Sequence, residues 1–463
     1  MKKIRFFTIS MVFILLLTLF GTPLCLAESS SSYELPKDTK VYAQSAILVS
    51  LGATQKEDVV LFERSADAVR APAAMVRIAV GMLAVKMIRE KNLDMDTVTG
   101  TYTQQCLEQI TGSGLATVGM SIGETWTLRD LLYMSMIETA ADAVITLAIT
   151  LCGSQTEFVN QMNQLVSSPE VGCANTQFSN VHGLDAANHR TTARDMYRIL
   201  RYAMDYPEME TMLSTVSYTV NPIKGGAKRT YSNVNAMLRS STGSYYAAMA
   251  FGRTGYTTDA GRCMASVARD SGYEYLAVVM GCPNEMPGES SVAVGTSHYL
   301  DSQTLFRWAF RNFSYKTLLS KNDPVHRLPV ELAWDTDFVM LVPSKDFATI
   351  VYDQLSEDTI IKRKVDIPES VKAPIQKGQV IGKVEIIINL DQKIGEVELV
   401  ASESIEQSKV LAIWDNIQSF LKSPWFYLAI ALLVILLVGY IIMNVMHNRK
   451  RRRNRMKRVK KYK

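Results

Sequence analysis

The spacing of apolar and polar positions divides the body of the chain into two regions. Two short apolar runs, 46–49 and 59–62, predict a β-hairpin near the start of the body. From Pro72, apolar residues recur at helical spacing and place Met75, Ile78 and Met82 on one side of a predicted helix. The same spacing predicts helices over 128–136, 140–151, 157–165 and 192–204, and strands over 245–251, 262–269 and 273–280. Helices between early and late strands indicate one α+β domain whose sheet uses both ends of the region.

The pattern changes after about residue 323. Pro343, Pro368, Pro374 and Gly378 interrupt β-rich runs, which predict a small all-β domain. These runs cover 338–342, 348–352, 359–365, 380–390 and 395–400. The segment that follows has an amphipathic helical pattern up to Lys422. Three placements of this helix fit the pattern: a stalk, a helix on the membrane surface, or a helix packed on the β domain.

Both ends of the chain carry targeting patterns. Basic residues within 1–5, an apolar run over 6–20 and small residues at Cys25 and Ala27 are typical of a secretory signal peptide. An uncleaved membrane anchor is the alternative. Near the other end, 425–446 is a run of 22 residues without charge, which is long enough to cross a bilayer as a helix. A basic tail follows, and basic flanks stay cytoplasmic, so we expect the body to lie outside the cell membrane.

The distribution of charge supports a body outside the membrane and a tail inside it. The net charge of +5 includes 11 basic residues between 449 and 463 and three at the N-terminus. The remainder carries 36 basic against 45 acidic residues, a charge of about −9. A body of that sign does not favour nucleic-acid binding, which needs a basic face to neutralise phosphates. The tail's simplest interpretation is a stop-transfer signal attracted to anionic lipid.

Seven segments between about 45 and 315 carry a recognisable pattern. They are Ala71-Pro72-Ala73-Ala74-Met75-Val76-Arg77-Ile78, Leu128-Arg129-Asp130-Leu131-Leu132-Tyr133, Ala141-Asp142-Ala143, Phe158-Val159-Asn160-Gln161-Met162-Asn163, Phe178-Ser179-Asn180-Val181-His182-Gly183-Leu184-Asp185, His189-Arg190-Thr191-Thr192-Ala193-Arg194-Asp195-Met196 and Arg253-Thr254-Gly255-Tyr256-Thr257. In this order they resemble the low-molecular-weight penicillin-binding proteins, the D-alanyl-D-alanine carboxypeptidases. The β-rich segment with Ala373-Pro374-Ile375-Gln376-Lys377-Gly378 resembles that family's C-terminal domain.

The resemblance implies acyl transfer from the terminal D-Ala-D-Ala of peptidoglycan stem peptides, through a serine acyl-enzyme and the motifs S-x-x-K, S-x-N and K-T-G. This chain departs from all three. Ala74 and Arg77 stand at the S-x-x-K positions, where a nucleophile and a base are needed. Thr139-Ala140-Ala141 stands at S-x-N, and Arg253-Thr254-Gly255 at K-T-G. Arginine can hold a carboxylate with two hydrogen bonds, so Arg253, Thr254 and Gly255 are the predicted substrate-binding residues.

The sequence therefore predicts an α+β penicillin-binding, β-lactamase-like transpeptidase domain, a small all-β domain and a C-terminal transmembrane helix. The predicted function is that of a pseudoenzyme at the cell wall that binds stem peptides, with cell-wall synthesis proteins as further candidate partners. An active carboxypeptidase with an unrecognised nucleophile is the alternative, and a purely structural protein with a vestigial groove is another. The predicted segments are a signal peptide 1–27, a leader 28–44, the carboxypeptidase-like domain 45–320, the β domain 325–403, an amphipathic stalk 404–424, a transmembrane helix 425–446 and a cytoplasmic tail 447–463.

No cofactor or metal is predicted. His182, Asp185 and His189 have spacings that on a helix could bind a metal, but Gly183 indicates a loop. The other histidines, His298, His326 and His447, are isolated, and we expect them to have structural roles. After signal cleavage an odd number of widely spaced cysteines remains, which does not indicate a disulfide framework. The spacing is compatible with one disulfide bridge or with buried free thiols.

Overall fold

The computed structural model describes residues 33–285, 293–356, 359–388 and 392–459. The predicted signal peptide, the first residues of the leader and the last four residues of the tail lie outside these ranges. Contacts between Cα atoms divide the chain into two compact parts. One part extends to Ser314 and includes Tyr352–Gln354, and the other contains Tyr315–Val351 and the residues from Leu355 onward. Each part is described separately.

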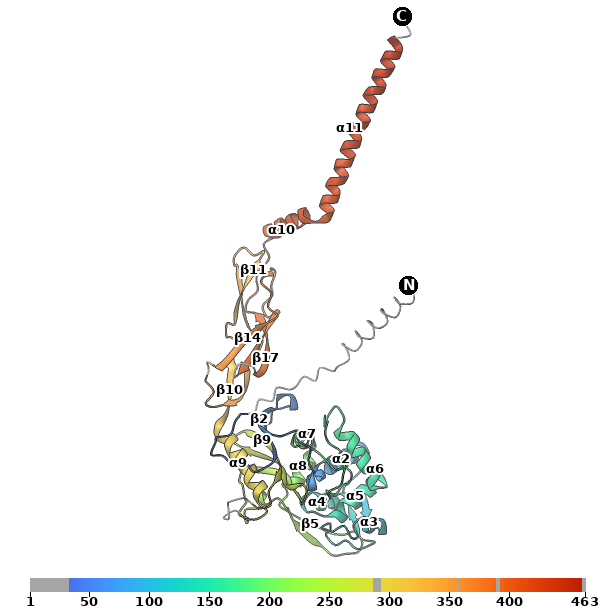
Figure 1. The fold of residues 1–463 in the computed structure, drawn as a ribbon, viewed down its shortest axis with the longest axis vertical. Coiled ribbons are helices and arrows are strands. Elements are labelled where there is room, and N and C mark those ends of the chain that lie inside the picture. Colours follow the sequence, from blue (N-terminus) through green and yellow to red (C-terminus); the bar gives the residue numbers. More distant parts are fainter. Residues whose placement is uncertain (1–32, 286–292, 357–358, 389–391, 460–463) are drawn as a thin grey trace, which may run out of the picture. The chain divides into compact units, whose positions relative to one another are not determined.

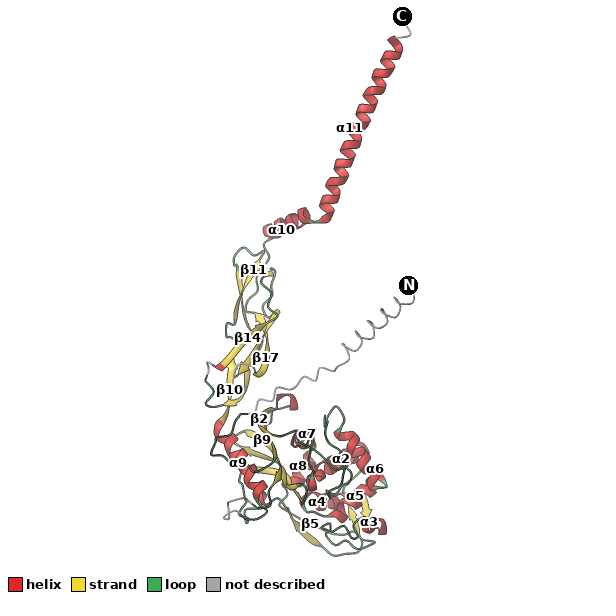
Figure 2. Ribbon diagram, in the orientation of Figure 1, coloured by secondary structure: helices red, strands yellow, loops and turns green. Residues whose placement is uncertain are grey.

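A five-stranded antiparallel sheet forms the centre of the N-terminal part (Figures 1 and 2). Its order, β2-β1-β9-β8-β7, pairs the first two strands of the chain with three strands more than 180 residues later. This confirms the prediction that both ends of the region complete the sheet. The strands are β1 (Ser45–Ser50), β2 (Val59–Arg64), β7 (Met249–Thr257), β8 (Gly261–Asp270) and β9 (Tyr273–Cys282).

Helices cover both faces of this sheet. In Figure 1, α9 lies on one side of it, and α2 and α7 lie on the other. The pattern missed α9, although it packs directly on β8 and β9. The helices are α2 (Val76–Glu90), α3 (Gln104–Glu108), α4 (Leu128–Ile137), α5 (Ala141–Cys152), α6 (Gln155–Val166), α7 (Ala193–Ala203), α8 (Pro207–Ser214) and α9 (Ser297–Asn312). Shorter elements are η1 (Gln55–Glu57), β3 (Thr99–Thr101), β4 (Thr125–Thr127), β5 (Ser217–Val220), β6 (Arg229–Ser232) and the 3-10 turns η2 (Ala73–Met75) and η3 (Ala236–Leu238).

The central helix α2 differs from its prediction. Twelve of its 15 residues are buried, so it is surrounded by other elements and does not present one apolar side. It contacts α4, α5, α6, α7 and α8. A helix that is apolar all round is a core helix, and this position makes Arg77, in its first turn, a buried charge.

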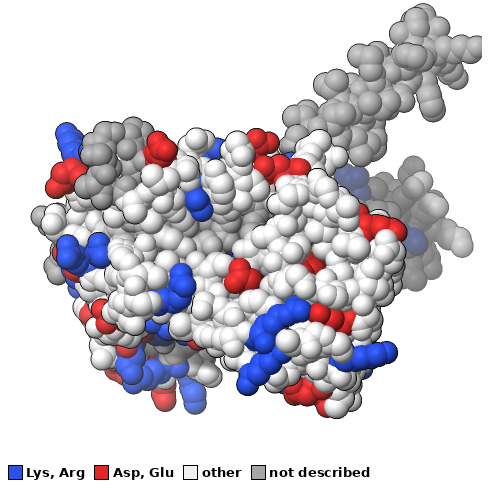
Figure 3. All heavy atoms as spheres, turned by 90° about the horizontal axis from the view of Figure 1, so that it is seen from below, with Lys and Arg blue, Asp and Glu red and all other residues white. Residues whose placement is uncertain are grey.

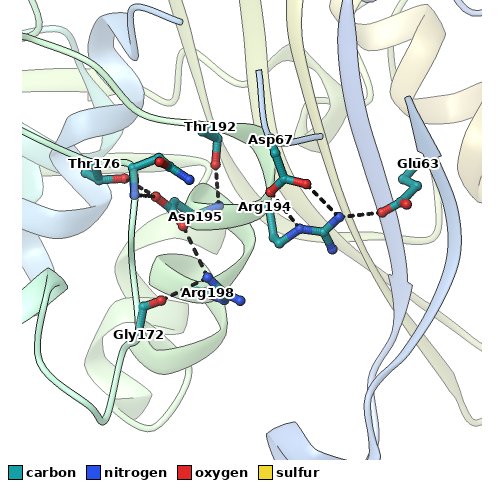
Figure 4. Close-up of polar contacts among 9 residues, drawn as sticks. Glu63, Asp67, Gly172, Thr176, Thr192, Arg194, Asp195 and Arg198 are labelled. Atoms are coloured by element: carbon teal, nitrogen blue, oxygen red, sulfur yellow. Dashed lines mark hydrogen bonds and ion pairs between the residues drawn. The ribbon is translucent and has the colours of Figure 1, made fainter. Parts of the chain in front are cut away.

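Polar contacts hold the segment from Thr191 to Met196 in place at the start of α7 (Figure 4). The Thr192 hydroxyl accepts a hydrogen bond from the Asp195 backbone N–H at 3.0 Å and caps the helix. The carboxylate of Asp195 accepts from the Thr176 hydroxyl at 2.8 Å, and Arg194 pairs with Glu63 of β2 at 2.6 Å. These contacts fix α7 to the neighbouring loop and to the edge of the sheet.

The C-terminal part begins with a β-rich region, as predicted. A six-stranded sheet has the order β14-β16-β17-β12-β11-β15, with only β11 and β15 parallel, and β10 and β13 form a separate pair. Leu328, Leu341, Val384 and Leu399 are among its buried core residues. The strands are β10 (Phe313–Leu319), β11 (His326–Glu331), β12 (Phe338–Pro343), β13 (Phe347–Tyr352), β14 (Ile360–Val365), β15 (Val371–Lys372), β16 (Val380–Ile388) and β17 (Gln392–Ala401).

Two helices complete the chain. In α10 (Lys409–Lys422), apolar side chains such as Ile413, Trp414 and Phe420 are exposed on the helix surface. The last helix, α11 (Pro424–Val459), contains a stretch from Pro424 to Arg452 that is long and apolar enough to cross a membrane, with a mean hydropathy of 2.8 over an 18-residue window. None of this stretch is buried against the rest of the protein.

Candidate functional site

A cavity of about 280 Å³ lies where the predicted site residues meet. It collects residues from η2, the α4–α5 turn, β7, β8 and the start of α9. Of the predicted site residues, Ala74, Thr139, Thr254 and Gly255 line it, whereas Arg77, Ala141 and Arg253 do not. The full lining is Ala74, Thr139, Val234, Thr254, Gly255, Tyr256, Arg262, Gly295, His298 and Tyr299.

Close backbone packing places Ala74 at this cavity. A Cβ atom at Gly255 of β7 would lie 2.8 Å from the Ala74 backbone nitrogen, and one at Gly183 would lie 2.4 Å from the Ala73 carbonyl oxygen. Both positions need glycine because the strand and the loop lie directly against η2. Ala73 itself has a φ of +47°, an uncommon backbone conformation for alanine. The backbone at this position is thus tightly determined, while the side chain of Ala74 is a methyl group.

Arg77 is fully buried one turn after Ala74. Its Nη1 donates to the Ala140 carbonyl at 2.8 Å and, at 3.4 Å, to the Ser135 carbonyl. Its Nε and Nη2 have no hydrogen-bond partner among the described residues. Burial, followed by the positive charge of Arg253, lowers the pKa of the Arg77 guanidinium well below its usual value. The Arg77 Nη1 is nevertheless engaged as a hydrogen-bond donor to the α4–α5 turn.

Arg253 lies on β7 and is also buried, with 1% of its surface exposed. Its Nη1 donates to the Met136 carbonyl at 2.7 Å, and its Nη2 donates to the Glu138 carbonyl at 3.0 Å. Its Nε has no partner among the described residues. Burial lowers the pKa of Arg253 to about 10, and the nearby Glu138 carboxylate partly opposes that shift. The guanidinium is therefore bound to the protein's own backbone, in a position from which it does not reach the cavity.

The two arginines together hold the turn between α4 and α5. The carbonyls that accept from them belong to residues 135, 136, 138 and 140, on both sides of Thr139. The Thr139 backbone N–H donates to the Glu138 carboxylate at 3.2 Å, and the Ala141 N–H donates to the Ala116 carbonyl at 2.9 Å. The turn that presents the Thr139 side chain to the cavity is thus fixed from its buried side.

Six residues of the lining were not predicted as site residues: Val234, Tyr256, Arg262, Gly295, His298 and Tyr299. The Arg262 guanidinium lies over the Tyr256 ring at 4.0 Å from its centroid and donates to the Asn284 side-chain oxygen at 3.0 Å. His298, expected to be structural, is 2% exposed, and its Nδ1 has no partner among the described residues. Burial and the charge of Arg262 lower the pKa of His298 to about 3, so its imidazole is neutral at physiological pH. The sequence offered no signal for α9 folding back on this cavity.

The three residues weighed as metal ligands have separate partners. His189 accepts a hydrogen bond at Nδ1 from the Ser179 backbone N–H at 3.0 Å, and His182 accepts one at Nδ1 from the Leu184 N–H at 3.2 Å. Asp185 accepts from the Thr257 hydroxyl at 2.8 Å. Among the described residues, no group of three or more His, Cys, Asp or Glu is placed to hold a metal ion. The five described cysteines are free thiols.

The fold is that of the penicillin-binding proteins of this size. Penicillin-binding protein 5 from Haemophilus influenzae has a similar structure, with a TM-score of 0.59 and 22% identity over 81% of this chain and 100% of that one. A regulatory factor of peptidoglycan synthesis from Streptococcus pneumoniae is similar at a TM-score of 0.56 and 19% identity, over 79% of this chain and 100% of that one.

The sequence matches define the family. A model of the D-alanyl-D-alanine carboxypeptidases matches residues 32–284, and one of the penicillin-binding protein 5 C-terminal domain matches residues 313–407. The chain therefore belongs to the D-alanyl-D-alanine carboxypeptidase family. Its relatives include DacF of Bacillus subtilis, 24% identical over 85% of this chain and 91% of the relative, and DacC of Escherichia coli, 26% identical over 77% and 84%. The resemblance and the fold class expected from the sequence are both confirmed.

Proposed function

We propose that this chain is a membrane-anchored member of the family that binds peptidoglycan stem peptides without cleaving them. Ala74 carries the proposal: it lines the cavity, and the sequence resemblance aligns it with the family's nucleophile, although its side chain is a methyl group. Loss of the nucleophile alone costs a serine hydrolase roughly 10⁶ in turnover, about 8 kcal/mol of barrier. A cavity that keeps its backbone framework without that group is suited to binding.

Arg77 supports the same proposal. A general base must release its proton and then take one from the nucleophile. The Arg77 Nη1 instead donates to the Ala140 carbonyl at 2.8 Å, and the side chain lies outside the cavity lining. Its role in this chain is to hold the α4–α5 turn.

Covalent labelling by a fluorescent penicillin tests the proposal. The purified protein is incubated with the penicillin, denatured and separated by electrophoresis. We expect no fluorescent band, because a stable acyl adduct needs a nucleophile. A band that survives denaturation would overturn the proposal.

An active carboxypeptidase is the second candidate, and one observation favours it. The Thr139 side chain lines the same cavity as Ala74 and carries a hydroxyl group. Release of D-alanine from a stem-peptide mimic by the purified protein, lost in a Thr139→Val variant, would establish this activity. No release between pH 5 and pH 9 would exclude it.

For the location we propose a single-pass protein of the cell membrane, with the folded body outside and the basic tail inside. The apolar stretch of α11 and the basic residues that follow it support this orientation. We further propose the segment boundaries expected from the sequence as the functional division of the chain. On the face drawn in Figure 3, Lys and Arg side chains are interspersed with Asp and Glu, a distribution that does not favour nucleic acid as a partner.

A further inference from the structure

The predicted carboxylate-binding residue, Arg253, is already engaged. Two of its nitrogens donate to the carbonyls of Met136 and Glu138, and the side chain is 1% exposed. Turning the guanidinium toward a ligand would leave both carbonyls without these donors, and each unpaired buried group is costly. A ligand carboxylate in the cavity therefore needs another cation.

Arg262, at the start of β8, is the cation that lines the cavity. The Tyr256 ring, at 4.0 Å, and the Asn284 side-chain oxygen, at 3.0 Å from Nε, hold its guanidinium in place. Gly295 makes room for it, because a Cβ atom there would lie 2.8 Å from Nη2. No carboxylate of the described residues lies within ion-pair distance of Arg262, whereas Arg269 of the same strand pairs with Glu210 and Glu274. Arg262 is thus a positioned cation without a paired carboxylate in the part of the chain that the structure describes.

A second residue of the same lining carries an unpaired polar atom. His298 is 2% exposed, and its Nδ1 has no hydrogen-bond partner among the described residues. An unpaired buried polar atom destabilises the protein unless a ligand or water satisfies it. As a neutral imidazole in the Nδ1–H tautomer, it can donate one hydrogen bond to an anion. The hydroxyl groups of Thr139 and Thr254 complete the polar lining.

We infer that Arg262, positioned by Tyr256 and assisted by His298, binds the terminal carboxylate of the ligand in this cavity. This inference rests on the proposed function, which identifies the ligand as a peptide. A planar guanidinium matches a carboxylate with two parallel hydrogen bonds, and the Nη atoms of Arg262 are the ones left for that contact. The site thus selects peptides that end in a free carboxylate over peptides that end in an amide.

Calorimetric titration of the full-length protein in detergent tests the inference. The probes are N,N′-diacetyl-L-Lys-D-Ala-D-Ala and the same peptide with a C-terminal amide. We expect the wild-type protein to prefer the free acid. Arg262→Gln should weaken binding of the free acid by roughly ten- to a hundredfold and remove the preference, because it deletes a charge-assisted pair of hydrogen bonds. Arg262→Lys should keep the preference with lower affinity, because lysine keeps the charge without the fork.

Arg269→Gln is the matched control, since it removes an arginine from the exposed end of β8 and should leave both affinities unchanged. Thermal unfolding of each variant shows whether it is folded. A folded Arg262→Gln protein that binds the free acid as tightly as wild type, with the preference intact, would overturn the inference and leave the proposed function standing. Failure of the wild-type protein to bind either peptide would overturn the proposed function itself, and the inference with it.

Discussion

At the scale of single residues, two arginines stand at the positions that the sequence resemblance aligns with lysines of the family, and both are bound to the backbone of this chain. Arg77 donates to backbone carbonyls of the α4–α5 turn through Nη1, whereas Arg253 uses both Nη1 and Nη2. A lysine in place of Arg253 would present one ammonium group and could not hold two carbonyls in the same fixed fork geometry. Arg77 and Arg253 have thus become parts of the framework on which the cavity is built.

Restoring the hydroxyl group alone should therefore not restore acyl transfer. We expect Ala74→Ser to remain unlabelled by fluorescent penicillin, because Arg77 stays committed as a donor to the Ala140 carbonyl and no base is gained. Labelling is measured after denaturing electrophoresis. Ala74→Gly, which adds no hydroxyl, is the control. A covalent band with Ala74→Ser would mean that another group in the cavity serves as the base.

The buried histidines make stability depend on pH. Burial lowers the pKa of His189 to about 4 and that of His298 to about 3, from about 6.5 in the unfolded chain. Below pH 6.5 the unfolded chain binds protons that the folded protein does not, so the free energy of unfolding falls as the pH falls toward 4. We expect each histidine to cost about 2 kcal/mol between pH 7 and pH 5. Urea unfolding followed by tryptophan fluorescence at the two pH values measures the loss.

His189→Asn separates this effect from other acid effects. An asparagine oxygen can still accept from the Ser179 N–H but does not titrate. The variant should lose less stability on acidification than the wild-type protein, by about 2 kcal/mol. An equal loss in both proteins would show that His189 does not contribute.

At the scale of elements, β7 and the end of α4 depend on each other through Arg253. Met136 lies in the last turn of α4 and Glu138 is its C-terminal cap residue, so the two carbonyls are ones that a helix end leaves without intrahelical donors. A positive charge also suits the C-terminal end of a helix. The arginine that was expected to bind substrate thus caps a helix.

Replacing Arg253 by methionine should accordingly destabilise the N-terminal part of the protein. Methionine fills similar volume but leaves the carbonyls of Met136 and Glu138 without donors, which we expect to cost about 2–4 kcal/mol. Chemical denaturation measures the change. Arg269→Met removes an exposed ion pair instead and should cost less than about 1 kcal/mol. Equal effects of the two variants would contradict the capping role.

The helices and strands show how much of the fold the sequence predicts. The apolar pattern predicted the strands of the sheet and most helices, because their buried faces repeat at the spacing of the element. It placed the strand before Arg253 at 245–251, whereas β7 extends from Met249 to Thr257 and contains the whole Arg253-Thr254-Gly255 motif. It missed α9, whose packing on the sheet is a long-range contact without a local signal. Arg262 and His298 were missed for the same reason, since only the folded chain brings β8 and α9 to one cavity.

At the scale of the whole molecule, the net charge of +5 averages over two environments in the topology proposed above. The 11 basic residues between 449 and 463 follow the apolar stretch of α11, while the rest of the chain is acidic. Basic residues next to a membrane span are retained on the cytoplasmic side. The distribution of charge thus supports the proposed orientation and carries no implication for the fold.

This orientation predicts the outcome of a protease-protection experiment on intact cells without an outer barrier. With an epitope tag after Lys463, protease added outside should degrade the folded body and leave a small tagged fragment that contains α11. Detergent should make that fragment sensitive, because it removes the bilayer that shields the tail. Replacing the basic residues of 449–463 by glutamine should reduce the protected fraction, since the retained charge is lost. Loss of the tag without detergent in the wild-type protein would place the tail outside and overturn the proposed topology.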